Sequence, residues 1–327
     1  MLKGLDERTA SIYTPIRLHL GRVEERLRGL SQTDNPYLAP LLDYVLASGG
    51  KRIRPAITLL AADFYPHQPE NPITMAAAVE LLHVATLIHD DTVDNSDLRR
   101  GKATVGNLWG QQVAVLFGDY VFATSATFVC DTGNVRVIRQ FSETIMDLAS
   151  GELIEYFSAF STEDARKLYD DRICRKTASL FRTAAETGAI LGGAPEPQIQ
   201  AMRAYGYNIG MAFQIVDDLL DVQGDVAELG KPVGKDLMQG VLTLPTIMLM
   251  ERYPDDNPIE KLFQEQGQDG KLEQALAMIN DSTIIEDCYA IIRQYCEAAS
   301  RSLDILPDCA SRRSLLDLSS YILERSY

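Results

Sequence analysis

Residues 73–94 have the sequence ITMAAAVELLHVATLIHDDTVD, and this stretch decides the fold. Its apolar residues recur at three- and four-residue spacing and cover most of the circumference, which predicts a long helix that is buried on nearly all sides. The same spacing recurs in residues 38–46 and 276–285, while the alternation typical of strands is almost absent. We therefore expect an all-α fold of about ten or more helices in one large domain over residues 1–327.

The composition is that of an ordinary soluble globular protein. Of the 327 residues, 46% are hydrophobic and 24% are charged, which argues against disorder and against a fibrous repeat. The 31 basic and 46 acidic residues give a net charge of −15. Because this charge repels phosphate backbones and anionic lipids, we expect no nucleic acid partner, and an anionic substrate would need a local concentration of cations.

Two further features indicate a cytoplasmic protein. The five cysteines lie far apart, are odd in number and form no C-x-x-C pair. This usage argues against zinc ligation and against a disulfide framework, and it fits a reducing cytosol. The N-terminal residues lead into no secretory signal, and no run reaches the roughly 18 apolar residues of a membrane span, so we expect no integral membrane segment.

Two clusters with the pattern D-D-x-x-D, residues 90–94 and 217–221, each end an apolar helical stretch. Residues four apart share a face of a helix, so Asp90 lies with Asp94, and like charges at that spacing repel each other. The helix dipole adds to this repulsion at a helix C-terminus. Carboxylates without a His/Cys set favour Mg²⁺. One such cluster is as typical of a solvated helix end as of a metal site, but two favour metal binding.

Basic residues gather in four places, which are local exceptions in an acidic chain. They are GGKRIRP at 49–55, RRGK at 99–102, KT at 176–177 and KPVGK at 231–235. Arginine forks suit phosphate oxygens, and lysine acts as a mobile point charge. Each cluster alone is typical of a solvated surface. Together with two magnesium-type clusters, they predict a diphosphate substrate, or two.

Together these stretches resemble the trans-type polyprenyl (isoprenyl) diphosphate synthases. The matching stretches run in the order of the family from residue 49 to about residue 246, and as a set they are highly specific. They are GGKRIRP, ELLHVATLIHDDTVDNSDLRRGKATVG, the dipeptides Gly118-Asp119 and Gly151-Glu152, KTASLFRTAAETGAILGG, GMAFQIVDDLLDV and GKPVGKDLMQGVLTLP.

The resemblance implies an isoprenoid synthase fold, which is an all-α bundle-like domain with a deep central cavity. Members of the family join isopentenyl diphosphate to an allylic diphosphate, head to tail, with about three Mg²⁺ ions on the leaving diphosphate. The resemblance also implies a homodimer. Because the motifs contain no obvious general base, the released diphosphate is the expected proton acceptor.

The resemblance also assigns roles to individual residues. The Mg²⁺ ions would be bound by Asp90, Asp94 and Asp217, with Asp91, Asp218 and Asp221 acting through water or through neighbouring ligands. The allylic diphosphate would be held by Arg99, Lys176, Thr177, Gln214, Lys231 and Lys235. Isopentenyl diphosphate would be held by Lys51, Arg54, His83 and Arg100. The expected catalytic residues are Asp90, Asp94, Arg99, Lys176, Thr177, Gln214, Asp217 and Lys231, with Thr177 and Gln214 stabilising the allylic cation.

Two positions need a separate interpretation. In many family members the segment after the second cluster is E-G-K-x-T-x-P, whereas this chain has QGVLTLP at 239–245. Val241 therefore replaces a lysine, whose role Lys231 and Lys235 would cover. His89 directly precedes the first cluster, and we interpret it as a hydrogen-bonding residue at the helix end.

The helix before the first cluster would wall the cavity for the growing product. Ala85 and Thr86 lie five and four residues before Asp90 and are small, and Leu82 lies about one turn deeper. In the family an aromatic residue here shortens the product, so this open floor predicts long chains of about C30 to C50. The alternative is a packed core blocked by a phenylalanine, with farnesyl or geranylgeranyl products. The candidates for that block are Phe117, Phe122, Phe128 and Phe141.

Three other functions compete with this interpretation. A terpene cyclase would share the first aspartate cluster but would not need GGKRIRP or the second cluster. A silent subunit of a heteromeric synthase would lack intact clusters, so the chain fits only the catalytic subunit of such an enzyme. A magnesium–diphosphate binding module would bind the substrate without turnover.

Overall fold

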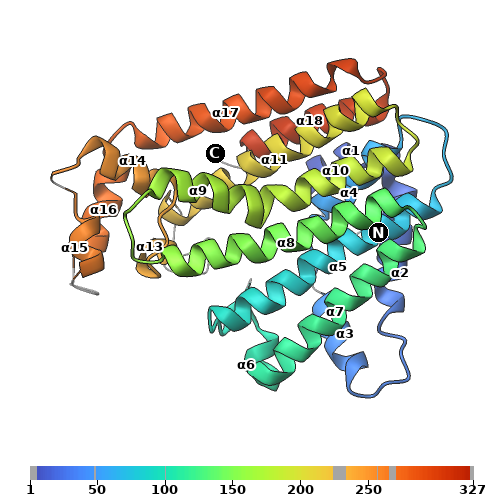
Figure 1. Cartoon of the computed structure of the whole chain (residues 1–327), viewed down its shortest axis with the longest axis horizontal. Helices are drawn as coiled ribbons and strands as arrows, with labels where there is room; N and C mark the ends of the chain where they lie inside the picture. The colour runs from blue at the N-terminus through green and yellow to red at the C-terminus, as the bar shows by residue number, and fades with distance from the viewer. Residues whose placement is uncertain are drawn as a thin grey trace. The chain divides into compact units, whose positions relative to one another are not determined.

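The computed structural model describes residues 6–47, 49–99, 101–223, 233–255, 257–264 and 270–324. This part of the chain is helical apart from one hairpin, which confirms the predicted all-α class (Figure 1). The hairpin pairs β1 (Leu98–Arg99) with β2 (Lys102–Ala103) in an antiparallel register. The chain forms two compact units, and the single domain over residues 1–327 stays a prediction.

Unit 1 comprises Met1–Glu143, Leu180–Gly206 and Leu303–Leu318. The helices wholly within it are α1 (Glu7–Ile12), η1 (Thr14–Ile16), α2 (Arg17–Gly29), α3 (Leu38–Leu46), α4 (Ile53–Ala62), α5 (Glu70–Val93), α6 (Val105–Trp109), α7 (Gln111–Asp131) and η3 (Leu303–Ile305). Nearly all of α10 (Ser179–Leu191) also belongs to it.

Unit 2 comprises Thr144–Ser179, Tyr207–Ser302 and Ser319–Tyr327. Its helices are α9 (Ala165–Ile173), η2 (Cys174–Ala178), α13 (Lys235–Met238), α14 (Leu244–Arg252), α15 (Ile259–Gln264), α16 (Lys271–Asn280) and α17 (Ile284–Ser302). Three long helices contribute residues to both units, namely α8 (Val135–Ser158), α11 (Glu196–Gln223) and α18 (Ala310–Glu324).

Helix α5 forms the core of unit 1, where it packs against α2, α4 and α7 (Figure 1). Residues 75–79 are completely buried, and the run of alanines among them lets the neighbouring helices approach closely. This burial confirms the helix that the opening stretch predicts. The helix ends at Val93, so its last turn carries the first aspartate cluster out of the core.

Helix α10 lies close to α4 at a glycine of the stretch KTASLFRTAAETGAILGG. A Cβ atom on Gly188 would lie only 2.2 Å from the carbonyl oxygen of Thr58, so a larger residue would force the two helices apart. Gly188 therefore serves helix packing within unit 1.

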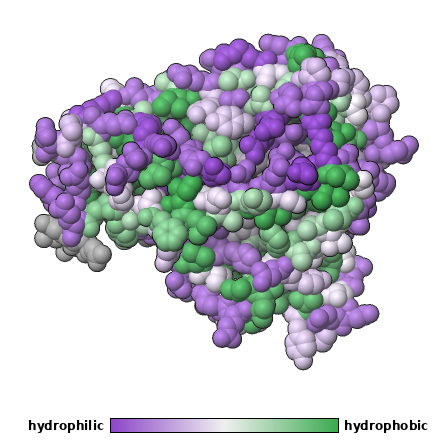
Figure 2. Space-filling view, viewed as in Figure 1, coloured by the Kyte–Doolittle hydropathy of each residue, from purple (hydrophilic) through white to green (hydrophobic). Residues whose placement is uncertain are grey.

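Two described helices, α5 and α7, are long and apolar enough to cross a membrane by length and composition alone. In α5, 78% of the apolar window is buried inside the protein, as in the core helix of a soluble protein. In α7, only 33% of the window is buried. Figure 2 shows apolar side chains in patches among polar ones over α7 and α8. The exposed apolar residues include Val115, Leu116 and Tyr120 on α7.

Candidate active site

The first aspartate cluster occupies the last turn of α5. Asp90 and Asp91 are half-buried, whereas Asp94 is exposed and caps the helix with its backbone N–H on the carbonyl of Asp90, 2.8 Å away. The carboxyl of Asp91 accepts from Nε of Arg99, which lies 2.7 Å from Oδ1 and 2.8 Å from Oδ2. The hairpin therefore brings a cation back onto the cluster.

The hairpin that carries Arg99 is anchored at its base. The hydroxyl of Tyr44 donates to the carbonyl of Ala103 over 2.7 Å, and the hydroxyl of Thr104 donates to the carbonyl of Ser96, also over 2.7 Å. The turn passes through Gly101 with a φ of 73°, a conformation that favours glycine. These contacts hold Arg99 beside Asp91. Arg100 lies outside the described residues.

His89 lies beside the cluster and packs against α7. Its Nε2 is 3.3 Å from the carbonyl oxygen of Val115 and 3.5 Å from Oδ1 of Asp119. A Cβ atom on Gly118 would lie only 2.2 Å from that nitrogen, so only glycine leaves room for the imidazole. The dipeptide Gly118-Asp119 therefore forms the seat of His89, in keeping with its interpretation as a hydrogen-bonding residue.

The residues predicted for isopentenyl diphosphate lie on α4, α5 and the loop before α4. Lys51, Arg54 and His83 are all half-buried. The guanidinium of Arg54 stacks over the ring of Phe181, with its Cζ 4.4 Å from the ring centroid. This stacking sets the direction of the Arg54 side chain, since the ring face attracts the cation.

The predicted product-length residues lie one to three turns before the cluster. Leu82 and Ala85 are completely buried, and Thr86 is half-buried with its hydroxyl donating to the carbonyl of His83 over 2.8 Å. On α7, which packs against α5, Phe117 is buried. A role for these residues in product length stays a prediction.

In unit 2, Lys176 and Thr177 lie on η2, a single π-helical segment between α9 and α10. The ammonium of Lys176 lies 2.8 Å from Oε1 of Glu152 and 2.7 Å from Oε1 of Glu155. A Cβ atom on Gly151 would lie 2.7 Å from the backbone nitrogen of Lys176, so glycine allows α8 to approach η2. Within the dipeptide Gly151-Glu152, Gly151 therefore allows α8 to pack closely against η2, and Glu152 provides one of the two carboxylates that pair with Lys176.

The second aspartate cluster lies in the last turns of α11. Its middle residue, Asp218, accepts the last hydrogen bond in a series of polar side chains. The hydroxyl of Thr177 donates to Oε1 of Gln214 over 2.5 Å, and Nε2 of Gln214 donates to Oδ1 of Asp218 over 2.8 Å. The hydroxyl of Tyr169 donates to the other carboxylate oxygen over 2.6 Å. Three of the predicted residues thus come together, with Tyr169 as a fourth member.

Asp218 is buried, and burial raises the pKa of its carboxyl to about 7, although the hydrogen bonds from Tyr169 and Gln214 oppose this rise. Burial, together with the nearby charge of Asp218, raises the pKa of Tyr169 well above its ordinary value. The phenol therefore stays protonated as the donor. Sequence reasoning missed Tyr169, because nothing in the helix of residues 165–173 indicates a partner 49 positions away.

Asp217 and Asp221 are half-buried on the same helix. The carbonyl of Asp221 accepts from the backbone N–H of Gly234 over 2.8 Å, and its carboxylate accepts from the backbone N–H of Asp236 over 3.3 Å. Burial raises the pKa of Asp236, and the charge of Glu155 adds to the effect. Lys235 is half-buried beside Asp236, whereas Lys231 lies outside the described residues.

The segment with Val241 in place of the lysine is held in a defined position. The carbonyl of Leu242 accepts from the buried guanidinium of Arg172 over 2.7 Å, and the backbone N–H of Val241 donates to the carbonyl of Asp236 over 2.9 Å. Gly240 has a φ of 79°, and a Cβ atom there would lie 2.6 Å from the ring of Phe160. The glycine of the family pattern therefore keeps its structural role without the lysine.

Within the described residues, no three His, Cys, Asp or Glu side chains converge as a ready-made metal cage. The donor set at both clusters consists of carboxylate oxygens, which suit a hard divalent cation. Mg²⁺ keeps several waters and binds through one or two carboxylates together with substrate phosphates. Carboxylate clusters of this kind fit a divalent cation that binds together with the substrate phosphates.

Comparison with known proteins identifies the family. The model of the polyprenyl synthetase family matches residues 35–279. The chain belongs to this family. The heptaprenyl diphosphate synthase component 2 of Geobacillus stearothermophilus is 36% identical over 320 residues, which cover 97% of this chain and 99% of that protein.

Solved structures agree with the assignment. A decaprenyl diphosphate synthase from Rhodobacter capsulatus superposes with a TM-score of 0.91 at 35% identity, over 98% of this chain and 99% of that one. A polyprenyl synthase from Caulobacter crescentus, complexed with calcium and isoprenyl diphosphate, has a TM-score of 0.91 at 30% identity, over 98% of each chain. The isoprenoid synthase fold predicted from the sequence is thereby confirmed. The relatives named as heptaprenyl and decaprenyl diphosphate synthases agree with the predicted long-chain character.

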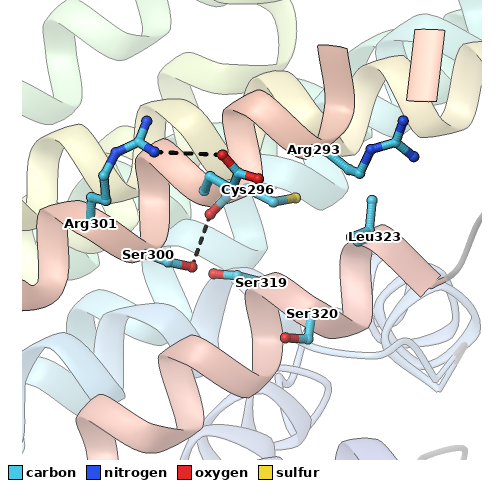
Figure 3. Close-up of a pocket in the computed structure, with 8 residues that line it drawn as sticks. Arg293, Cys296, Ser300, Arg301, Ser319, Ser320 and Leu323 are labelled. Atoms are coloured by element: carbon cyan, nitrogen blue, oxygen red, sulfur yellow. Dashed lines mark hydrogen bonds and ion pairs between the residues drawn. The ribbon is translucent and has the colours of Figure 1, made fainter. Parts of the chain in front are cut away.

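The polyprenyl synthase also has a groove of about 370 Å³ in unit 2, between α17 and α18 (Figure 3). Arg301 pairs with Glu297 across 3.6 Å, and the hydroxyl of Ser300 donates to the carbonyl of Cys296 over 2.9 Å. Burial raises the pKa of the Cys296 thiol to about 12, so the thiol is unreactive at neutral pH. The groove is lined by none of the motif residues.

Proposed function

We propose that the polyprenyl synthase condenses isopentenyl diphosphate with an allylic diphosphate, head to tail, to give a trans polyprenyl diphosphate of about C30 to C50. One observation supports the proposal: each aspartate cluster has either an arginine or a hydrogen-bonded chain of polar side chains beside it. In unit 1 the cation is Arg99 on Asp91. In unit 2 the chain runs from Thr177 through Gln214 to Asp218.

The carboxylates of Asp90, Asp94 and Asp217 would hold Mg²⁺, with support from Asp91, Asp218 and Asp221. The ions supply positive charge where the diphosphate leaving group gains negative charge. The solved structure of the Caulobacter crescentus polyprenyl synthase, which is complexed with calcium and isoprenyl diphosphate, supports the proposal of a divalent cation. About three ions would serve one reaction, as the resemblance to the family implies.

The chain's own residues would hold the two substrates and the developing cation. Arg99, Lys176 and Lys235 would bind the allylic diphosphate, and Lys231 would join them. The amide of Gln214 is oriented by its hydrogen bond to Asp218. The amide oxygen in turn accepts from the hydroxyl of Thr177 and so fixes the position of that hydroxyl. That hydroxyl donates to Gln214 and keeps its lone pairs for the positive charge of the allylic cation.

Isopentenyl diphosphate would be bound by Lys51, Arg54 and His83, with Arg100 as a fourth member. The double bond of isopentenyl diphosphate attacks the allylic cation, and a proton then leaves. Since no described motif residue is placed as a dedicated base, the released diphosphate would accept that proton. The tail of the product would extend past Ala85 and Thr86 toward Leu82.

The test is to incubate the purified protein with isopentenyl diphosphate, a labelled allylic primer and Mg²⁺, and then to size the products by chromatography. We expect condensation that depends on the metal and products within the long-chain range. Failure to consume isopentenyl diphosphate with any primer would overturn the proposal. Products that stop at farnesyl or geranylgeranyl length would leave the reaction standing but overturn the chain length.

We further propose a cytoplasmic homodimer. The exposed apolar residues of α7 in unit 1, and separately Met146, Tyr156 and Phe157 on the unit 2 part of α8, support a protein partner. The relative named as a component of heptaprenyl diphosphate synthase makes a heteromeric enzyme the second candidate. Light scattering of the chain expressed alone, beside a turnover assay, separates the two. An active dimer supports the homodimer, and an inactive monomer supports the heteromer.

A further inference from the structure

Arg52 stands between the two cations of the GGKRIRP loop and has an unusual backbone. It precedes the first residue of α4 with φ 50° and ψ 35°, which is the left-handed region that favours glycine. Two glycines lie two and three positions before it, at positions 50 and 49, yet position 52 is an arginine. A strained backbone at a residue with a long side chain indicates that the side chain is needed there.

The side chain of Arg52 is buried between two carboxylates. Its Nε lies 2.5 Å from Oε1 of Glu24 on α2, and another guanidinium nitrogen lies 2.5 Å from Oε1 of Glu80 on α5. The side chains of Arg52 and Glu80 are only 7% and 8% exposed. Burial opposes the charge of Arg52, but the attraction of Glu80 and the hydrogen bond to Glu24 outweigh it and raise the pKa of the guanidinium. Arg52 therefore stays charged, and its guanidinium is engaged by Glu24 and Glu80 inside the protein.

The two ion pairs fix the loop to its surroundings at the point between Lys51 and Arg54. On one side, the buried hydroxyl of Tyr13 donates to the carbonyl of Lys51 over 2.8 Å. On the other side, the carbonyl of Arg52 accepts from the backbone N–H of Ala56 over 2.9 Å and so begins α4. The backbone on both sides of Arg52 therefore has one conformation, which sets where Lys51 and Arg54 can point.

Glu80 extends this arrangement to the third predicted ligand of isopentenyl diphosphate. It lies three residues before His83 on α5, and residues three apart are neighbours on a helix surface. The same buried guanidinium thus connects α5, which carries His83, to the segment of residues 51–54, which carries Lys51 and Arg54. We name Glu24, Arg52 and Glu80 the buried clamp.

We propose that Arg52 is a positioning residue for isopentenyl diphosphate, and that the buried clamp holds Lys51 and Arg54 in the arrangement that binds the diphosphate. The inference rests on the proposed function, because it assumes that these cations bind isopentenyl diphosphate. It adds a residue that contacts no substrate and acts through Lys51 and Arg54.

Three variants separate the backbone from the charge. Arg52→Gly keeps the left-handed conformation without strain but removes the guanidinium, so it isolates the clamp. Arg52→Lys keeps a charge but loses the fork that reaches both carboxylates. Glu80→Gln keeps the shape of the clamp and removes one charge. The matched control is Arg136→Ala, which breaks a more exposed pair with Glu196 in the same unit.

In Arg52→Gly we expect the KM for isopentenyl diphosphate to rise about tenfold or more, while the KM for the allylic primer and kcat stay within about twofold. Arg52→Lys and Glu80→Gln should give smaller rises in the same parameter, and they serve as the test where Arg52→Gly does not fold. The control Arg136→Ala should leave all three parameters unchanged. A folded Arg52→Gly protein with an unaltered KM for isopentenyl diphosphate would overturn the positioning role.

A double-mutant cycle decides whether Arg52 acts through its neighbours. In an Arg54→Ala background, Arg52→Gly should raise the KM for isopentenyl diphosphate by much less than in the wild-type chain, because one of the residues it positions is gone. Fully additive effects would contradict the proposal. The failure of the proposed function looks different: the wild-type chain itself would then fail to consume isopentenyl diphosphate, and both proposals would fall.

Discussion

The two aspartate clusters share one pattern but have different surroundings. In unit 1, the middle residue Asp91 is half-buried and is held by the charge of Arg99. In unit 2, the middle residue Asp218 is buried and accepts hydrogen bonds from Tyr169 and Gln214. The first middle aspartate therefore belongs to an ion pair near the surface, and the second belongs to the interior. The two clusters therefore share a sequence pattern, but their middle aspartates are held by different kinds of interaction.

The largest expected effect tests what the clusters have in common. Asp90→Ala and Asp217→Ala should each lower kcat by about a thousandfold or more, because each removes an oxygen ligand of the cations that stabilise the leaving diphosphate. Folding should survive, since carboxylates of one cluster repel each other without metal. Steady-state kinetics at saturating Mg²⁺ and circular dichroism measure both. Near-normal turnover in either variant would remove that cluster from the metal site.

The second prediction tests whether Arg54 and Lys176 serve different substrates. Arg54→Ala in unit 1 should raise the KM for isopentenyl diphosphate by about tenfold or more, with little change for the allylic primer. Lys176→Ala in unit 2 should do the reverse. The measurement is the KM of each substrate at a saturating concentration of the other. Equal effects of each variant on both substrates would mean that the assignment of Arg54 and Lys176 to different substrates is wrong.

The third prediction tests an asymmetry between the helices before the clusters. Ala85 and Ala212 are both completely buried, and each lies five residues before the first aspartate of its cluster. Ala85→Phe should place a ring on the path of the product and shift it to about C15–C20, because this position lies more than one turn from the cluster. Overpacking alone would instead cost about 1–3 kcal/mol of stability.

Ala212→Phe is the matched control for this prediction. It adds the same ring at the equivalent position in unit 2 and should lower the melting temperature without shortening the product. Chromatographic sizing beside a thermal melt measures both variants. An unaltered product distribution from a well-folded Ala85→Phe protein, or equal shortening in both variants, would contradict a tunnel along α5.

The smallest expected effect concerns the free energy of unfolding and compares the two middle aspartates, Asp91 and Asp218. Asp218→Ala should lower the free energy of unfolding by about 1–3 kcal/mol, because it leaves the buried donors of Tyr169 and Gln214 without an acceptor. Asp91→Ala removes an ion pair closer to solvent and should cost less than about 1 kcal/mol. Urea unfolding measures both values. An equal or larger loss in Asp91→Ala would show that the two surroundings do not differ in energy.

The amino-acid sequence by itself determined the helical class, the two clusters and the family. These follow from local properties: helical spacing predicts α5 as a buried helix, and repulsion between aspartates four apart predicts a need for cations. Residues such as Lys51, Arg54 and Lys176 were also predicted, because four basic clusters stand out in a chain with a charge of −15. Such signals need only neighbours in the sequence.

Only the tertiary structure decided which partner each of these residues has. Tyr169 meets Asp218 across 49 positions, and Arg52 meets Glu24 and Glu80 across 28 positions in either direction. No periodicity in one helix predicts such pairs, because they depend on which faces of separate helices pack together and on how deeply the pair is buried. Burial also decided that Asp218 differs from Asp91, since the cost of a buried carboxylate arises only after other helices have excluded water.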